Sequence, residues 1–370
     1  MEPLNIMFLQ TAHAADDDRV WHHQAKTLLG LGHTVHVVAS SANFITNDRM
    51  TLIPTNNTSL CEKIKLYTKT LENLNPDIII CDTPVAVNCA RKLKKNNKRL
   101  KIIHDITEWY PSKKNLNGLN LVKKCLKFIA LALANWTVNL STDGFVFGEK
   151  YKARPFRILF PWKPFVMLPY YPDLQYIKPI EVGNIENTVR LFYAGDTTEE
   201  KGFPNVLEVA KLVAKRNAAI QVVLDVVTNG KIPSIVQKPE NLEISFKSWL
   251  PFEEFCRVAT GSDLFLDLRT VDFENTRCLP IKLFYYMAMQ RPVIYSDLKA
   301  VRKEYPEVLQ CGLIARPDDY ETIVSIIEEY IHNPAKYREH AANARRLAEE
   351  KYNWNAVKQD FTEFVESLWV

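Results

Sequence analysis

The stretch that decides the fold is Leu191-Phe192-Tyr193-Ala194-Gly195-Asp196-Thr197-Thr198-Glu199-Glu200-Lys201-Gly202. A short apolar run leads into a polar turn, and the apolar spacing that follows Gly202 predicts a helix. We expect Lys201 just inside this helix. Backbone N–H groups at a helix N-terminus, together with a nearby cation, favour a phosphate group. The stretch therefore predicts an α/β unit with an anion site where a buried strand meets a helix.

Short apolar runs alternate with helical patterns on both sides of this stretch, which predicts α/β domains with parallel sheets. The expected strands are 5–10, 34–39, 78–81, 101–104, 144–147, 189–194, 221–226, 243–246, 264–268 and 292–295. The expected helices are 16–29, 121–138, 204–216, 251–259, 281–289, 320–332, 334–350 and one near 354–368.

A chain of 370 residues is long for one hydrophobic core, so we expect two domains. A polar stretch at about 174–188 reads as the linker between a domain at 1–175 and a domain at 188–350. The simplest architecture is two Rossmann-like doubly wound domains facing across a cleft, because ligands of such sheets bind beyond the carboxyl ends of the strands.

Composition excludes several classes of protein. The chain is 47% apolar and 24% charged, as is usual for a folded protein, and it contains no dinucleotide or P-loop fingerprint. Its seven scattered cysteines lack metal spacing and read as buried free thiols. We see no signal peptide and no apolar run of about 18 residues, so we expect a cytoplasmic protein.

Charge is distributed unevenly along the chain. Residues 1–175 contain 23 Lys and Arg against 14 Asp and Glu, whereas the remainder contains 24 against 29. Residues 109–142 contain no acid, and residues 113–135 and 150–157 combine lysines or arginines with apolar side chains. Such segments suit an anionic membrane surface, although a core helix with a lysine-rich outer face has the same pattern. Nucleic acid fits less well, because the aromatic residues lie within apolar runs.

Several motifs, in their order and separation, resemble group 1 (family 4) glycosyltransferases of the GT-B fold. In the first half they are His13-Ala14-Ala15-Asp16-Asp17-Asp18-Arg19 and Gly32-His33-Thr34-Val35. In the second half they are Gly195 with Lys201-Gly202, then Leu279-Pro280-Ile281-Lys282-Leu283-Phe284-Tyr285-Tyr286-Met287-Ala288, then Arg291-Pro292-Val293-Ile294.

The resemblance implies retaining transfer of a sugar from a nucleotide-sugar to an acceptor, with no obligatory metal or other cofactor. It also implies that residues 351–370 form a helix returning to the first domain. The donor-binding residues that it implies are Gly195, Thr197, Lys201, Glu274, Arg277, Lys282 and Tyr285. Those on the acceptor side are His13, Asp18 and Arg19, and the candidate catalytic residues are Asp105, Thr107 and Glu108.

This sequence departs from the family pattern at particular positions. The family's two glutamates, eight positions apart, are Arg277 and Tyr285 here, and the histidine of its first-domain motif is Thr107. A tyrosine accepts fewer hydrogen bonds from a ribose diol than a glutamate does, which weakens ribose selection by about 1–3 kcal/mol. These changes fit either a different grip on the donor or the loss of catalysis.

Each candidate also has a plainer interpretation. Lys201 can pair with a neighbouring glutamate on a solvent-facing helix, an interaction of small energy. Asp105 and Glu108 suit acid–base work at a strand end, or they cap a short helix. Asp18 belongs to an acidic helix start, whereas Arg19 has the bidentate geometry that holds an acceptor phosphate. The histidines point apart on their strand or helix, so no metal site is expected.

We therefore expect a glycosyltransferase that builds a cell-surface polysaccharide on a lipid-linked glycan acceptor at the inner face of the membrane. One alternative is a degenerate GT-B protein that binds a glycan or a partner enzyme without catalysis. Another is a sugar-nucleotide epimerase or hydrolase of the same architecture, although that class calls for a cluster of histidines or carboxylates.

Overall fold

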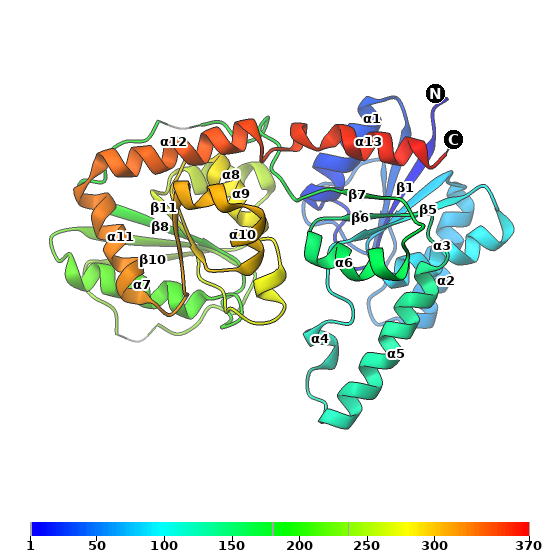
Figure 1. Cartoon of the computed structure of the whole chain (residues 1–370), viewed down its shortest axis with the longest axis horizontal. Helices are drawn as coiled ribbons and strands as arrows, with labels where there is room; N and C mark the ends of the chain where they lie inside the picture. Colours follow the sequence, from blue (N-terminus) through cyan, green and yellow to red (C-terminus); the bar gives the residue numbers. More distant parts are fainter. Residues whose placement is uncertain (1, 180, 236, 370) are drawn as a thin grey trace. The chain divides into compact units, whose positions relative to one another are not determined.

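The structure is a computed structural model that describes residues 2–179, 181–235 and 237–369. It divides into two compact units (Figure 1). Unit 1 comprises Met1–Tyr170 together with Val357–Val370, and unit 2 comprises Tyr171–Ala356. The last helix, α13 (Lys358–Ser367), therefore belongs to unit 1 although it ends the chain.

Unit 1 is built on a parallel sheet of seven strands in the order β3-β2-β1-β4-β5-β6-β7. The strands are β1 (Asn5–Gln10), β2 (Thr34–Ala39), β3 (Met50–Leu52), β4 (Ile78–Cys81), β5 (Lys101–Ile106), β6 (Gly144–Phe147) and β7 (Phe165–Met167). The helices are η1 (Asp18–Ala25), α1 (Lys26–Gly30), α2 (Leu60–Leu74), α3 (Pro84–Asn96), α4 (Lys113–Leu116), α5 (Leu121–Asn139), α6 (Lys150–Leu159) and α13.

Unit 2 is built on a parallel sheet of six strands in the order β10-β9-β8-β11-β12-β13. The strands are β8 (Thr188–Ala194), β9 (Gln221–Val227), β10 (Leu242–Lys247), β11 (Leu264–Asp267), β12 (Val293–Ser296) and β13 (Gly312–Ala315). The helices are α7 (Phe203–Arg216), α8 (Phe252–Thr260), η2 (Asn275–Arg277), α9 (Ile281–Ala288), α10 (Lys299–Glu304), η3 (Pro306–Cys311), α11 (Tyr320–His332), α12 (Pro334–Glu350) and η4 (Trp354–Ala356).

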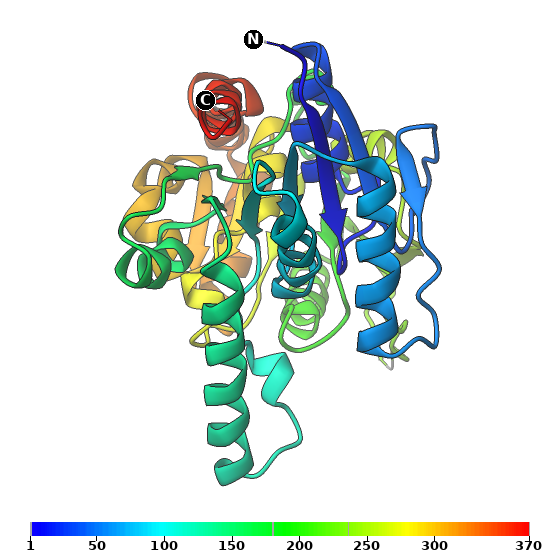
Figure 2. The ribbon, with the colours of Figure 1, turned by 90° about the vertical axis from the view of Figure 1, so that its right-hand side faces the viewer.

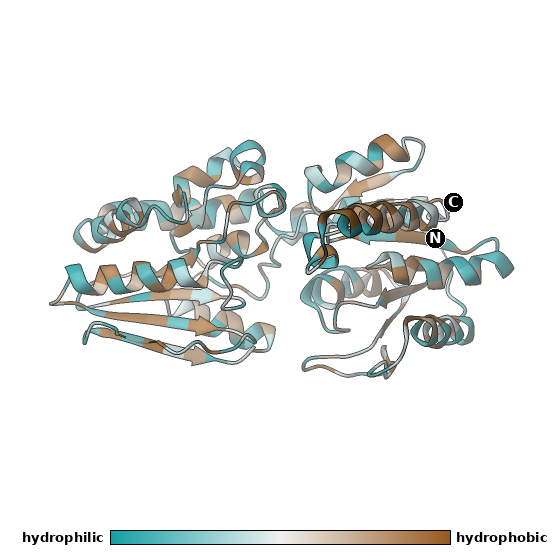
Figure 3. Cartoon of the chain, turned by 90° about the horizontal axis from the view of Figure 1, so that it is seen from below, coloured by the Kyte–Doolittle hydropathy of each residue, from teal (hydrophilic) through white to brown (hydrophobic). Residues whose placement is uncertain are grey.

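Both sheets are doubly wound with the same reversal of strand order, which confirms the predicted fold class. In each unit the first strand lies between the strand that follows it in sequence and the fourth strand, so the order switches at β1–β4 and at β8–β11. The central strands are almost fully buried, which explains their continuous apolar runs (Figure 3). Ligands of such sheets bind outside the carboxyl ends of the strands at the switch point.

The structure corrects several local expectations. The helix expected at 16–29 begins at Asp18, and its first eight residues are π-helical before α1 continues it. The strand expected at 101–104 extends through Ile106, so Asp105 lies within β5 and does not cap a helix. The short strands β3, β7 and β13 were not expected.

Two further observations concern the bulk features of the chain. The cysteines are all free, but Cys61 and Cys125 are exposed, contrary to the expectation of buried thiols. Among the described residues, no helix has both the length and the apolar character needed to cross a membrane.

Candidate functional site

The loop after β8 is shaped by two glycines. Gly202 has φ of 80°, and a Cβ placed on it would lie 2.0 Å from the carbonyl oxygen of Leu268. Only glycine fits this conformation and this close approach. A Cβ on Gly195 would lie 3.0 Å from Nζ of Lys282. The loop is therefore pressed against the end of β11 on one side and against a lysine on the other.

Lys201 lies in the turn before α7, not inside the helix as expected. Gly202 is the N-cap residue, and the first helical residue is Phe203. The side chain of Lys201 is partly exposed and lies 3.5 Å from a carboxylate oxygen of Glu200. An exposed pair of this kind contributes less than about 1 kcal/mol, so an anionic ligand can replace the carboxylate.

The loop also offers backbone donors. Among the described residues, the backbone N–H groups of residues 196–200 donate no hydrogen bond. Its shape is held instead by side chains, since Tyr193 Oη donates to the carbonyls of Asp196 and Lys201, and Thr197 Oγ1 donates to that of Lys231. Free amides beside a helix N-terminus favour an anion.

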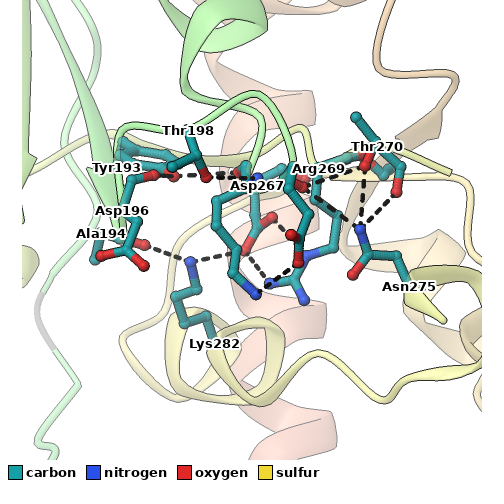
Figure 4. Close-up of polar contacts among 12 residues, drawn as sticks. Tyr193, Ala194, Asp196, Thr198, Asp267, Arg269, Thr270, Asn275 and Lys282 are labelled. Carbon is teal, nitrogen blue, oxygen red and sulfur yellow. Dashed lines mark hydrogen bonds and ion pairs between the residues drawn. The ribbon is translucent and has the colours of Figure 1, made fainter. Parts of the chain in front are cut away.

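A buried ion cluster lies beside this loop at the carboxyl end of β11 (Figure 4). Asp267 is fully buried and accepts two hydrogen bonds from Arg269, at 2.9 and 2.7 Å. Lys282, from α9, reaches the same carboxylate at 2.9 Å and donates to the carbonyl of Ala194. Two cations thus share one carboxylate, and the cluster carries a net charge of +1.

Electrostatics keep this cluster ionised at the aspartate. Burial opposes the charge on Asp267, but Arg269 and Lys282 outweigh burial and hold the pKa of the carboxyl well below its usual range. Burial lowers the pKa of Lys282, and the nearby charges of Arg269 and Lys201 act in the same direction while Asp267 opposes them. An added anion would favour the charged form of Lys282.

Lys282 has a donor left for a ligand. Its ammonium group carries three N–H donors, of which Ala194 and Asp267 take two, and a quarter of its side chain is exposed. Sequence reasoning found Lys282 and Lys201 but missed Asp267 and Arg269. The available signal was a lone acid at the end of the apolar run Leu264-Phe265-Leu266, two positions before an arginine.

The other expected donor residues lie in the segment that leads into α9. Arg277 covers the ring of Phe273 at 3.9 Å and donates to the Phe273 carbonyl, and Glu274 is partly exposed just before η2. Tyr285 is 4% exposed and meets the ring of Phe252 edge-on at 5.8 Å. The two positions where the family has glutamates thus pack against aromatic rings.

In unit 1, Arg19 and Asp105 bind each other inside the fold. Arg19 donates to both carboxylate oxygens of Asp105, at 3.0 and 2.9 Å, and also to the carbonyl of Leu168. Gln24 donates to the same carboxylate. Arg19 is 3% exposed and Asp105 is 5% exposed. Arg19 is therefore a structural cation and not the open acceptor-side group that we expected, and Asp105 is its structural partner.

His13 and Asp18 lie at the start of η1. His13 Nδ1 is 3.7 Å from Asp17 Oδ2, and Tyr170 Oη donates to both Asp17 and Asp18. Burial and the neighbouring charge of Asp18 raise the pKa of Asp17 to about 6. His13 and Asp18 are partly exposed, and their acceptor-side role stays a prediction.

Thr107 and Glu108 follow β5. The backbone carbonyl of Thr107 accepts a hydrogen bond from Lys152, which also contacts Glu149 at 3.2 Å. Among the described residues, Thr107 Oγ1 is buried without a hydrogen-bond partner, and Glu108 is exposed. Sequence reasoning missed Glu149 and placed Lys152 in the membrane-facing segment 150–157, whereas Lys152 is 5% exposed and contacts Glu149. In the described part of the chain, no three His, Cys, Asp or Glu side chains are grouped as a metal site requires.

Asp82 marks the switch point of unit 1. It follows β4 directly, is 6% exposed, and accepts backbone N–H groups of Thr11 and Ala12, both at 2.9 Å. Its other oxygen accepts a hydrogen bond from the hydroxyl of Thr11. Two backbone N–H groups of the loop after β1 therefore donate to a carboxylate of the same unit and are not available to a ligand.

Comparison with known families places unit 2. Residues 188–333 match the family model described as "Glycosyl transferases group 1". Unit 2 contains a group 1 glycosyl transferase domain. A comparison with curated protein sequences found no match.

Solved glycosyltransferases share the fold of the whole chain. A sucrose-phosphate synthase from Thermosynechococcus elongatus superposes with a TM-score of 0.72 at 14% identity, covering 99% of each chain. HepE from Anabaena, solved with UDP, gives 0.68 at 12% identity and covers 98% of this chain and 100% of its own. WaaG, a glycosyltransferase involved in lipopolysaccharide biosynthesis, gives 0.68 at 14% identity, covering 97% and 99%. The predicted GT-B fold with its glycosyltransferase domain is confirmed.

Proposed function

We propose that this protein transfers a sugar from a nucleotide-sugar donor to a glycan acceptor. The observation that carries the proposal is the group of cations and free backbone donors at the switch point of unit 2. Two lysines, Lys201 and Lys282, and the unused amides of residues 196–200 surround the end of β8. The family match of residues 188–333 supports the same assignment.

The chemistry needs this kind of site. When the glycosidic bond to the donor breaks, negative charge grows on the leaving diphosphate. Fixed cations and helix-terminal amides stabilise such charge without reorganising. Lys201 and Lys282 supply the positive charge that this stabilisation needs. We therefore propose transfer without a metal. Chelation with EDTA would then leave the rate unchanged, whereas a metal-dependent enzyme would lose activity.

The finer features of the proposal concern mechanism and acceptor. We propose transfer with retention at the anomeric carbon, which NMR of the product tests directly. We propose a lipid-linked acceptor of cell-surface polysaccharide synthesis, reached by unit 1 at the cytoplasmic face of the membrane. Thr107 and Glu108 remain the candidate catalytic residues, and His13 and Asp18 remain the predicted acceptor-side groups. HepE was solved with UDP and with UDP-glucose, which makes uridine nucleotides the first to try.

The test is a thermal-shift screen against nucleoside diphosphates and their sugar conjugates. A ligand at about 100 times its dissociation constant adds about 2.7 kcal/mol of stability. We expect one nucleotide class to raise the melting temperature, and Lys201→Ala to remove the effect. Lys215→Ala is the matched control, because Lys215 is an exposed lysine in the last turn of α7. A shift that persists in Lys201→Ala would contradict the assigned site.

A second candidate is a GT-B protein that binds a glycan or a partner without catalysis. The packing of Arg277 on Phe273 and of Tyr285 on Phe252 favours it, because no carboxylate stands at these two positions. Absence of any nucleotide shift, together with binding of glycan fragments, would make this the better assignment.

A further inference from the structure

Helix α5 is unlike the other elements of unit 1. Residues 121–130 are all exposed, including large apolar side chains such as Leu121 at 76%, Leu126 at 65% and Ile129 at 54%. Figures 1 and 2 show the helix projecting away from the sheet of unit 1, with the short helix α4 alongside it and the free end of α5 extending beyond α4. An apolar surface of this extent usually marks a binding site.

Within the described residues, the buried side chains of α5 lie near its C-terminal end. Its buried residues are Asn135, Val138 and Asn139, all in the last two turns. Oδ1 of Asn139 accepts a hydrogen bond at 2.7 Å from Nδ1 of buried His104, and the side-chain nitrogen of Asn139 donates to the carbonyl of Asn135. Lys163, from the segment after α6, donates to backbone carbonyls at the C-terminal end of α5. The C-terminal end of α5 is therefore held by these polar contacts and by Val138, which packs into the core of unit 1, while the side chains of residues 121–130 are exposed.

The free part is amphipathic. At 100° per residue, Phe128, Leu121, Ile129, Leu133 and Leu126 span an apolar arc of about 160°. Lys123 and Lys124 border the two edges of this arc, and Lys127 lies between them on the opposite side. Figure 3 shows the apolar colouring along this helix. The arc is wider than the narrow seam of a coiled coil, and lysines at its edges can extend toward lipid headgroups.

A second apolar and basic group lies next to the base of α5. Ile158, Leu159 and Trp162 are 70%, 51% and 66% exposed, and Arg154 and Arg157 between or beside them are exposed as well. Lys163, which binds the end of α5, directly follows Trp162. The exposed surface of α5 and the exposed group at 154–162 are thus neighbours within unit 1.

We infer that α5 is a membrane-docking helix whose apolar arc enters the headgroup region of an anionic bilayer, with the surface at 154–162 as a second contact. Charge selects this occupant. Residues 109–142 carry five lysines and no acid, so two copies of the helix would repel each other, whereas anionic lipids would attract it. The inference extends the membrane location in the proposed function by naming the element that makes the contact.

The test is flotation of the full chain with vesicles of phosphatidylcholine alone and with added phosphatidylglycerol. We expect binding to the anionic vesicles. Leu126→Glu with Ile129→Glu should reduce partitioning at least about 100-fold by placing charges in the arc. Lys123→Gln with Lys124→Gln and Lys127→Gln should cost roughly 100-fold on anionic vesicles, at about five-fold per lysine. Because these residues are exposed, the variants should fold, which circular dichroism checks.

The control is Leu60→Glu with Leu66→Glu, two exposed leucines of α2 in the same unit. Control binding equal to wild type supports the inference. Unchanged flotation of the α5 variants would overturn it. So would a dimer in sedimentation velocity that Leu126→Glu with Ile129→Glu converts to monomer, since the helix would then join two copies. A nucleotide thermal shift measured on each variant separates failure of docking from failure of the donor site in unit 2.

Discussion

Asp82 in unit 1 and Asp267 in unit 2 occupy the same place in two sheets of the same strand order. Each lies at the carboxyl end of the strand beside the first strand of its sheet, and each is buried. Asp82 accepts the backbone N–H groups of the loop that follows β1. Asp267 instead binds Arg269 and Lys282, and among the described residues the backbone N–H groups of residues 196–200 donate no hydrogen bond.

The difference shows how the same strand order can give a switch point whose N–H groups are occupied and another whose N–H groups are available to a ligand. In unit 1 the carboxylate of Asp82 accepts hydrogen bonds from the N–H groups that an anionic ligand would need. In unit 2 two cations neutralise the carboxylate and leave a positive charge and free amides at the switch point. The nearby pair of Arg19 and Asp105 strengthens the contrast, because that arginine has a carboxylate of its own and is buried.

The largest effect is expected from Asp267→Asn. Loss of the carboxylate leaves Arg269 and Lys282 as buried cations without compensation, which costs about 3–5 kcal/mol of unfolding free energy. Urea denaturation measures the loss, and a nucleotide titration measures the disturbed site. Asp82→Asn is the control: we expect about 1–3 kcal/mol from a weakened acceptor and no change in nucleotide binding. If Asp267→Asn and Asp82→Asn changed nucleotide binding equally, the proposed distinction between the two switch points would be wrong.

Gly202→Ala should come next. The new Cβ would collide with the carbonyl of Leu268, and an alanine would have to keep a left-handed backbone conformation. We expect a loss of roughly 2–4 kcal/mol of unfolding free energy and a displaced loop. The melting temperature and the nucleotide affinity should both fall. Gly30→Ala is the matched control, because nothing lies within 4 Å of the added atom and its φ is not positive. A stable variant with unchanged affinity would show that the loop does not bind the donor.

Lys282→Met sharpens the comparison at the level of binding. Loss of a hydrogen bond from a charged group costs about 1.5–3 kcal/mol, so the dissociation constant for a nucleoside diphosphate should rise by roughly 10–100-fold. Asp267 keeps Arg269, so stability should change less than in Asp267→Asn. Calorimetric titration gives the constant, with Lys215→Ala for comparison. Affinity retained in Lys282→Met would assign the lysine to structure alone.

The smallest effect concerns pH. The folded pKa of Asp17 is about 6, above the unfolded value of about 3.9, so the folded state binds more protons between these values. Its stabilising contribution is therefore present at acid pH and lost as pH rises through 6. Asp17→Asn should gain about 1–3 kcal/mol relative to wild type between pH 4 and pH 7.

Asp267 should behave in the opposite way. Its pKa is held well below the usual range, so its contribution is present at neutral pH and lost as pH falls below about 4. Urea denaturation across this range distinguishes the two carboxylates. A constant difference between Asp17→Asn and wild type would contradict the raised pKa of Asp17.

Much of the fold could be predicted because the signals are local. Strands such as β1, β2, β4 and β6 are continuous apolar runs, and their bounds matched residue for residue. The loop after β8 could be located for the same reason, since a strand, two glycines and a lysine are adjacent in sequence. Lys201 was placed inside the helix because the left-handed conformation of Gly202 depends on contact with Leu268, far away in sequence.

The sequence by itself determined two doubly wound units, a loop suited to phosphate after β8, and an apolar, basic segment at 113–135. Each depends on periodicity or on neighbours along the chain. Only the tertiary structure decided that Arg19 is buried on Asp105, that Asp267 holds Arg269 and Lys282, and that α5 projects with its apolar arc exposed. Pairing of charges and burial of helix faces depend on which distant segments meet, and no local pattern contains that information.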